Sequence, residues 1–236
     1  MARRCPLLLL VAIAACSLHR EPAPPVASEP PTDLLWSALS HPKTVAWARR
    51  FCVKMATQPA TRLGLVPSRP IIPQLEAILA EYGVPRELAA VPAVESGYRQ
   101  WARGAHGELG LWQLRPATAR RFGLQVSARN DERAHVDRST RAAARYLAIL
   151  YARYGDWPLA LAAYNAGEGR VDRALARRPG ATFWELAEGK ALPRTSRDYV
   201  PKILAVVRVT ASPDSCPRML APEQSGPLVA AGERTI

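Results

Sequence analysis

The sequence predicts an all-α fold built around a single core. Apolar residues recur with helical spacing from Ile72 onward, and glycine or proline marks the ends of successive helices. No stretch alternates apolar and polar residues as a strand would. A chain of 236 residues with 48% hydrophobic content is long enough to bury one such core. We therefore expect one helical domain with functional loops between its helices.

A helical N-terminal extension is expected over residues 33–70. Its helix runs roughly from Asp33 to Met55, and four prolines then break the chain into loops: Pro59, Pro67, Pro70 and Pro73. The extension either packs against the core or forms a wall of the substrate site.

The main domain is expected over residues 71–211. Leu75, Ile78 and Leu79 share one helix face, Gly83 ends that helix, and Pro85 opens the next, which runs to about Ser96. Four further helices are expected at 116–122, 137–154, 157–164 and 197–210. Residues 212–236, rich in proline and glycine, are expected to be a disordered tail.

The N-terminus predicts export. Residues 1–15 combine a basic start with a short apolar run and small residues, which is typical of a signal peptide. The sequence Ile13-Ala14-Ala15-Cys16 resembles the lipobox of bacterial lipoproteins, in which the cysteine is acylated and becomes the new N-terminus. An ordinary signal peptide cut nearby is the alternative. Residues 16–32 are a proline-rich linker after the lipidated Cys16, and Ser17 favours the outer membrane.

The charge and the cysteines fit an exported chain. A formal charge of +12 favours an anionic partner, but the export signal argues against nucleic acid. Once Cys5 and Cys16 are set aside, Cys52 and Cys216 remain in a compartment that permits a disulfide, and the sequence leaves that bridge open. No His or Cys cluster predicts a metal site, and no cofactor is implied.

Glu95 is the candidate catalytic residue. Val91, Pro92 and Val94 surround it, and Gly97 marks the end of its helix. Apolar surroundings and the negative end of the helix dipole both raise the pKa of a carboxyl group. A carboxylic acid that stays protonated near neutral pH can donate a proton to a glycosidic oxygen.

Four ordered motifs accompany Glu95: VESGY, then GLWQ at 110–113, AYNAG at 163–167 and YV at 199–200. Together they resemble the catalytic domain of lytic transglycosylases of the SLT type, with a likeness to the membrane-bound murein transglycosylase D branch, over approximately Ile72 to Val209. The resemblance implies a lysozyme-like, goose-type α domain. It implies Glu95 as catalytic acid and base, and substrate contacts from Ser96, Trp112, Gln113, Tyr164, Asn165 and Tyr199. It also implies that Tyr199 reaches towards the carboxyl group of Glu95. Trp112 is alternatively a core residue, and Tyr164 a buried helix residue with a satisfied hydroxyl.

The chain departs from the family pattern at one place. A serine that commonly stands nine positions after the catalytic glutamate, and donates a hydrogen bond to the sugar, is Gly104 here. The small pair that often precedes the GLWQ glycine is Glu108 and Leu109. Glu95 and its neighbours are intact, so activity is still expected, while this departure leaves donor geometry and substrate preference open.

The resemblance implies cleavage of the bond between N-acetylmuramic acid and N-acetylglucosamine in peptidoglycan strands. The C6 hydroxyl of the substrate replaces water as nucleophile and leaves a 1,6-anhydromuramoyl end, so one carboxylate is enough, whereas ordinary glycosidases need two. No second acid lies inside a motif. The alternatives are a hydrolytic muramidase and a non-catalytic glycan-binding lipoprotein on the same fold.

Overall fold

A computed structural model describes residues 32–57, 70–211 and 216–217. The predicted signal peptide, Cys16, nearly all of the proline-rich linker and most of the predicted tail lie outside the described residues. So do Pro59 and Pro67. Within the described ranges the chain is helical and has isolated β-bridges but no strand, which confirms the predicted all-α class.

The predicted helix from Asp33 to Met55 is wrong in its continuity. The structure has two helices, α1 (Thr32–Leu39) and α2 (Pro42–Thr57). Pro42 lacks a backbone N–H and its ring collides with a preceding helical carbonyl, so a helix can begin at Pro42 but not run through it. The hydroxyl of Thr44 donates to the carbonyl oxygen of Ala38 across the break, at 3.1 Å.

The next two predicted helices are present with one change of type. Helix α4 (Ile71–Glu81) includes Pro73, which was predicted to lie in a loop and instead occupies the first turn, where its missing N–H costs nothing. The predicted helix from Pro85 to Ser96 is a 3₁₀ helix, η1 (Arg86–Ala90), followed by α5 (Val91–Glu95). Pro92 interrupts the α-helical hydrogen bonds there.

The remaining elements are α6 (Pro116–Arg121), η2 (Glu132–Ala134), α7 (Val136–Tyr154), α8 (Trp157–Ala166), α9 (Glu168–Arg177), α10 (Phe183–Glu188) and α11 (Arg194–Ala211). Helices α6, α7, α8 and α11 agree with the prediction to within three residues at each end. Helices α9 and α10 were not predicted. The start of α10 carries a readable signal, a capping box in which the Thr182 and Glu185 side chains each bond to the backbone of the other.

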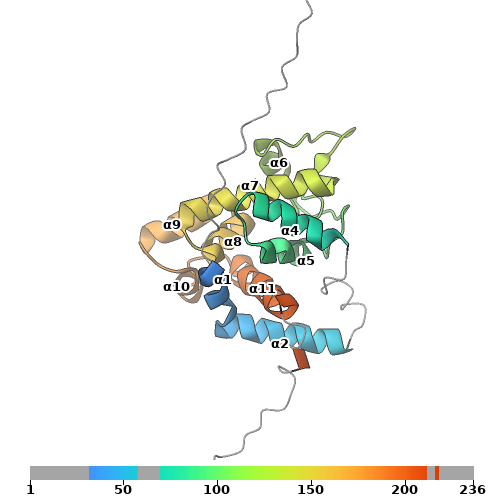
Figure 1. Cartoon of the computed structure of the whole chain (residues 1–236). Coiled ribbons are helices and arrows are strands. Elements are labelled where there is room, and N and C mark those ends of the chain that lie inside the picture. Colours follow the sequence, from blue (N-terminus) through green and yellow to red (C-terminus); the bar gives the residue numbers. More distant parts are fainter. Residues whose placement is uncertain (1–31, 58–69, 212–215, 218–236) are drawn as a thin grey trace, which may run out of the picture.

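Helix α11 lies in the middle of the fold. In Figure 1 it has α2 below it and α4 and α5 above it, and it contacts α2, α8, η1 and α5. Helix α7 packs against α8 and α4. The core that these helices share includes the fully buried side chains Leu75, Leu79, Leu88, Trp112, Leu147, Leu150, Trp157, Leu161 and Phe183.

The N-terminal extension packs against the core, which was one of its two predicted roles. Helix α2 lies along α11, and Leu35 of α1 is fully buried in the shared core. Cys52 of α2 is bonded to Cys216, just beyond α11, so the bridge that the sequence left open is present. The guanidinium of Arg208 donates to the carbonyl oxygen of Leu39, at 3.1 Å.

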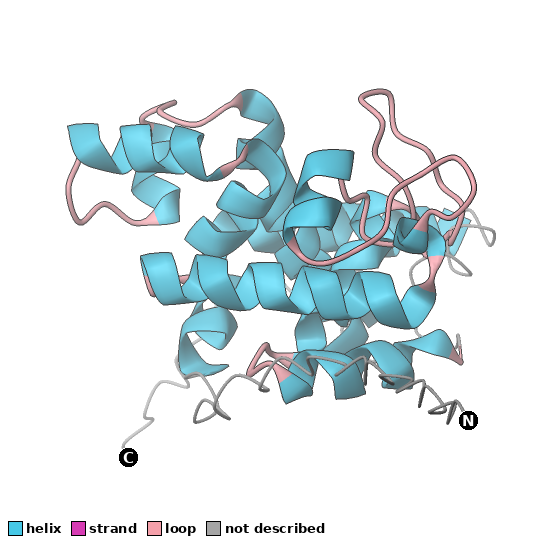
Figure 2. Cartoon of the chain, turned by 90° about the horizontal axis from the view of Figure 1, so that it is seen from above, coloured by secondary structure: helices cyan, strands magenta, loops and turns pink. Residues whose placement is uncertain are grey.

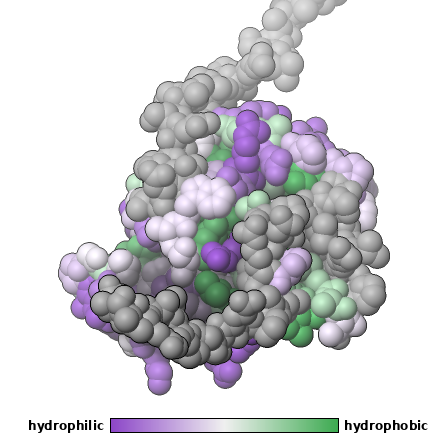
Figure 3. Space-filling view, turned by 60° about the horizontal axis from the view of Figure 1, so that its bottom comes forward, coloured by the Kyte–Doolittle hydropathy of each residue, from purple (hydrophilic) through white to green (hydrophobic). Residues whose placement is uncertain are grey.

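Long loops gather on one side of the helical body (Figure 2). The face drawn in Figure 3 is mixed, with hydrophilic and hydrophobic side chains lying next to one another both near its centre and at its edge. None of the helices in the described ranges has the length and apolar character needed to cross a bilayer.

Candidate active site

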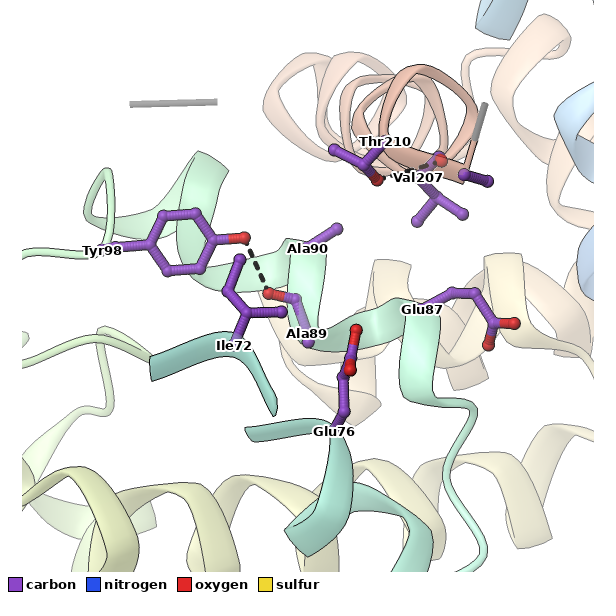
Figure 4. A pocket seen from close by; sticks show the side chains of 9 residues that line it. Ile72, Glu76, Glu87, Ala89, Ala90, Tyr98, Val207 and Thr210 are labelled. Carbon is purple, nitrogen blue, oxygen red and sulfur yellow. Dashed lines mark hydrogen bonds between the residues drawn. The ribbon is translucent and has the colours of Figure 1, made fainter. Parts of the chain in front are cut away.

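Glu95 is the last residue of α5, and the turn after it is held rigidly. Gly97 and Tyr98 both have positive φ, 60° and 58°. A tyrosine rarely adopts this conformation, and its neighbours hold it there. The Tyr98 hydroxyl donates to the carbonyl oxygen of Ala89 at 3.0 Å (Figure 4), and the ring is 6% exposed. The helix therefore ends where the sequence predicted, with Glu95 half-buried at its end.

The pocket in Figure 4 is a separate feature beside this turn. It lies between α4, η1 and α11, has a volume of about 120 Å³, and is lined mainly by apolar side chains together with Glu76 and Glu87. Glu95 is not among its lining residues.

The loop that carries GLWQ is closed by backbone hydrogen bonds. Gly104 N–H donates to the carbonyl oxygen of Glu108 at 3.0 Å, and Gly110 N–H donates to that of Ala102 at 2.9 Å. Gly110 has φ of +87°, and a Cβ there would lie 2.0 Å from the carbonyl oxygen of Arg133. Only glycine fits this position.

Arg133 holds the same loop from the other side, and sequence reasoning missed it. Its side chain is 5% exposed and donates to the carbonyl oxygens of Gly107 (2.6 Å) and Leu114 (3.0 Å). Asp131 pairs with it through both carboxylate oxygens, at 2.9 and 2.7 Å. A buried charge with these partners fixes the loop next to Glu95.

Tyr199, from α11, reaches Glu95 across the core. Its hydroxyl donates to Glu95 Oε1 at 2.6 Å, although the two residues are 104 positions apart in the chain. The prediction that this tyrosine reaches the carboxyl group of Glu95 is confirmed.

Burial is the main cause that raises the pKa of Glu95, to about 7. The hydrogen bond from Tyr199 lowers that pKa, and the negative charge of Glu108 raises it. The expected shift toward a protonated acid near neutral pH is confirmed in direction. At pH 7 both protonation states of Glu95 are populated, which suits a group that must give up a proton and then take one.

The AYNAG motif lies close to the same place. The Tyr164 hydroxyl donates to the carbonyl oxygen of Trp112 at 2.8 Å, and burial followed by the charge of Glu95 raises the pKa of Tyr164. Asn165 is exposed, and its amide oxygen accepts a hydrogen bond from the Ser196 hydroxyl at 2.8 Å. Tyr164 thus supports the GLWQ loop, while Asn165 faces solvent.

Gln113 adopts a positive φ of 47°, which aims its side chain back across its own loop. Its amide nitrogen donates to the carbonyl oxygens of Ala102 (3.0 Å) and Gly110 (2.8 Å). The amide oxygen lies near Gly104, 3.0 Å from where a Cβ would stand. The half-buried side chain is therefore held in one orientation.

Two predicted substrate-binding residues lie in the core instead. The Trp112 side chain is fully buried and its indole N–H donates to the Thr140 hydroxyl at 2.9 Å, so the prediction that it contacts sugar is wrong. Ser96 is 4% exposed, and its hydroxyl donates to the carbonyl oxygen of Leu111 at 2.9 Å. It fastens the end of α5 to the GLWQ loop, so its predicted contact with substrate is also wrong.

Glu108 is a second carboxylate at the site, and none of the four motifs predicted it. Its charge acts on Glu95, although it stands where the sequence pattern favours a small residue. The signal was present in the sequence as that unusual substitution next to Gly104. Across the part of the chain that the structure describes, no group of three His, Cys, Asp or Glu side chains could hold a metal ion.

Residues 74–187 match the family model of the transglycosylase SLT domain. The membrane-bound lytic murein transglycosylase D of Escherichia coli K12 is 40% identical over 128 residues, 52% of this chain and 27% of that protein. The peptidoglycan transglycosylase gp16 of Escherichia phage T7 is 31% identical over 123 residues, 51% of this chain and 9% of that protein. This chain thus spans about a quarter of the first relative's length and less of the second.

A solved structure shares the fold. The 70 kDa soluble lytic transglycosylase SLT70 of Escherichia coli matches with a TM-score of 0.53 and 22% identity, over 74% of this chain and 29% of that chain. The helical architecture, the ordered motifs around Glu95 and the match to the family model agree. Through residues 74–187, just under half of its length, this chain is similar to the transglycosylase SLT domain family.

Proposed function

We propose that the chain is a peptidoglycan lytic transglycosylase. It cleaves the β-1,4 bond between N-acetylmuramic acid and N-acetylglucosamine and leaves 1,6-anhydromuramoyl ends. The observation that carries this proposal is the state of Glu95, a half-buried carboxyl group with a pKa of about 7 and a hydroxyl donor on one of its two oxygens. The match of residues 74–187 to the SLT domain family model supports the same reaction.

Glu95 serves in both steps of the reaction. In the first, its proton passes to the glycosidic oxygen as the bond from that oxygen to C1 of the muramic acid breaks. In the second, the C6 hydroxyl oxygen of the same sugar bonds to C1 and its proton returns to Glu95. The nucleophile is part of the substrate, so its effective concentration is very high and no water need be activated.

The bond from Tyr199 assigns the two oxygens of Glu95. Oε1 accepts a hydrogen bond from the Tyr199 hydroxyl, with 2.6 Å between the two oxygens. The acidic proton of neutral Glu95 therefore belongs on Oε2. Oε2 is therefore the atom that gives and later recovers the proton. Between the two steps Glu95 is an anion, and the Tyr199 hydroxyl stabilises that charge.

The saccharide contacts are proposed for Gln113 and Asn165. Tyr199 is 6% exposed and acts through its hydrogen bond to Glu95, and Tyr164 supports the loop. Asn165 is exposed, and the Gln113 side chain is half-buried with its orientation fixed. Ser96 and Trp112 are left out because their side chains are buried.

A clearing assay on purified, insoluble peptidoglycan tests the proposed activity. We expect the chain to release soluble muropeptides at neutral pH. A chain that binds the polymer but releases nothing would contradict the proposal and favour a glycan-binding lipoprotein.

We further propose that the chain is exported and anchored by lipid on Cys16, at the periplasmic face of the outer membrane. The lipobox-like sequence supports this, as does the disulfide between Cys52 and Cys216, since such bonds persist in oxidising compartments. A relative described as membrane-bound also supports it. Mass spectrometry of the mature N-terminal peptide from membranes tests it, because an unmodified cysteine there would contradict the anchor.

A further inference from the structure

Gly104 and Glu108 share one space. A Cβ on residue 104 would lie 2.4 Å from Glu108 Oε2 and 2.9 Å from Glu108 Cβ. These distances are shorter than any van der Waals contact, so residue 104 cannot carry a side chain while Glu108 stays where it is. The Gln113 amide oxygen borders the same space, at 3.0 Å. The missing side chain at position 104 is thus replaced by a carboxylate beside the proposed site.

Glu108 is held in place as an anion. Its Oε2 accepts the backbone N–H of His106 at 2.8 Å, while Oε1 lies 3.7 Å from His106 Nδ1 and 3.8 Å from Arg115 Nε. Burial alone would raise the pKa of Glu108, but backbone N–H donors and the neighbouring His106 and Arg115 side chains bring it below its usual value. The side chain is 20% exposed, so it is neither free in solvent nor sealed in the core.

We propose that Glu108 is a positioning residue: it is a fixed negative charge, seated in the space that Gly104 leaves open, which keeps Glu95 in its proton-donating form. The part that concerns catalysis rests on the proposed function, whereas the electrostatic part does not. Glu108 lies in the loop that the Ser96 hydroxyl fastens to the end of α5, next to Glu95. Two carboxyl groups whose surroundings separate their proton affinities can serve as an acid and an anion in one site. Here Glu95 is the acid and Glu108 the anion.

The charged and titratable groups around the pair act in opposite directions. Tyr199 donates to Glu95 and favours its anion, while Glu108 disfavours it. Tyr164 lies near Glu95, and His106 and Arg115 flank Glu108. Removing the charge of Glu108 therefore lowers the pKa of Glu95, and removing the Tyr199 hydroxyl raises it.

The pH dependence of cleavage tests the proposal in the variant Glu108→Gln. Activity that needs protonated Glu95 is lost as pH rises through its pKa, so we expect the alkaline limb of kcat/KM to move to lower pH, by less than Tyr199→Phe moves it to higher pH, because Tyr199 has the larger effect on Glu95. Tyr199→Phe moves this limb upward, and Glu76→Gln, in the separate pocket of Figure 4, leaves it in place. A change that only damaged the loop would lower activity equally at every pH.

A measurement on the carboxyl group itself keeps the test independent of activity. Carbon-13 NMR titration of glutamate carboxyl groups, with Glu95 assigned by its absence in Glu95→Gln, gives the pKa directly in the full chain. We expect a lower value in Glu108→Gln than in the wild type. An unchanged value would overturn the proposal. An inactive wild type with the expected shift would overturn only the proposed function.

The shared space is tested by a double-mutant cycle. Gly104→Ser should lower the melting temperature of the wild type by several degrees because its side chain collides with Glu108. In Glu108→Gly both colliding atoms, Oε2 and Cβ of residue 108, are absent, and we expect the same substitution to lower the melting temperature much less. Equal losses in both backgrounds would show that Glu108 does not fill this space, which would overturn the geometric basis of the proposal.

Discussion

Replacing Glu95 by glutamine should slow the release of soluble muropeptides from peptidoglycan about a thousandfold. The glutamine amide has the size and shape of the carboxylic acid, but it has no acidic proton to donate to the glycosidic oxygen. Glu76→Gln is the matched control, since it removes a carboxyl group from the pocket between α4, η1 and α11, and it should leave the rate unchanged. Equal clearing by Glu95→Gln and wild type would rule out Glu95 as the catalyst.

The pH dependence of stability shows whether Glu95→Gln has lost only its catalytic acid or also its stable fold. The pKa of Glu95 rises from 4.5 to about 7 on folding, so the folded chain binds more protons than the unfolded chain between those values. Wild-type stability therefore falls as pH increases from about 4.5 to 7. Glutamine does not titrate, so the variant lacks this loss of stability. The melting temperature of Glu95→Gln, relative to that of the wild type, should therefore be higher at pH 8 than at pH 4. The opposite trend would show that Glu95 does not have a raised pKa.

Removing the disulfide should reduce the free energy of unfolding by about 3–5 kcal/mol. Cys52 and Cys216 are 164 positions apart, so their bond closes nearly the whole described chain into one loop and restricts the unfolded state. The replacement Cys52→Ser also leaves a polar group where a side chain is 1% exposed. Urea unfolding of the double serine variant measures the loss.

Reduction of the wild type provides the control for this prediction. A thiol reductant should bring the urea midpoint of the wild type close to that of the double variant and leave the variant unchanged. Helix α2 should remain packed on α11 under native conditions, because Thr44 and Ala48 are fully buried there. Identical midpoints for oxidised wild type and the double variant would show that the bond does not stabilise the fold.

Much of the fold was predictable because its helices carry local signals. Gly83, Pro85 and Pro116 mark helix boundaries that the structure confirms within a residue or two. The errors have local causes as well: Pro42 divides one predicted helix into two, and Pro92 converts part of another to 3₁₀ geometry. Helix α9 is short and strongly charged on one side, and its first acidic residue is typical of a helix N-terminus, so the helix itself was not predicted.

The sequence motifs predicted which residues gather at the candidate site, but not which of their side chains face the substrate. Glu95 and Tyr199 lie in contact, as the ordered motifs predicted. Trp112 and Ser96 lie in the same motifs but face inward, and a motif does not state which of its side chains support the loop and which face the substrate. Glu108 was missed because its effect depends on the space at Gly104, which only three-dimensional packing reveals.

The most direct test of the account is the end group of the product when peptidoglycan is digested in water enriched in oxygen-18. If the C6 hydroxyl closes on C1, mass spectrometry should show 1,6-anhydromuramoyl ends, lighter than reducing ends by one water and free of the heavy isotope. Reducing muramic acid ends that carry oxygen-18 would contradict the account and establish a hydrolytic muramidase.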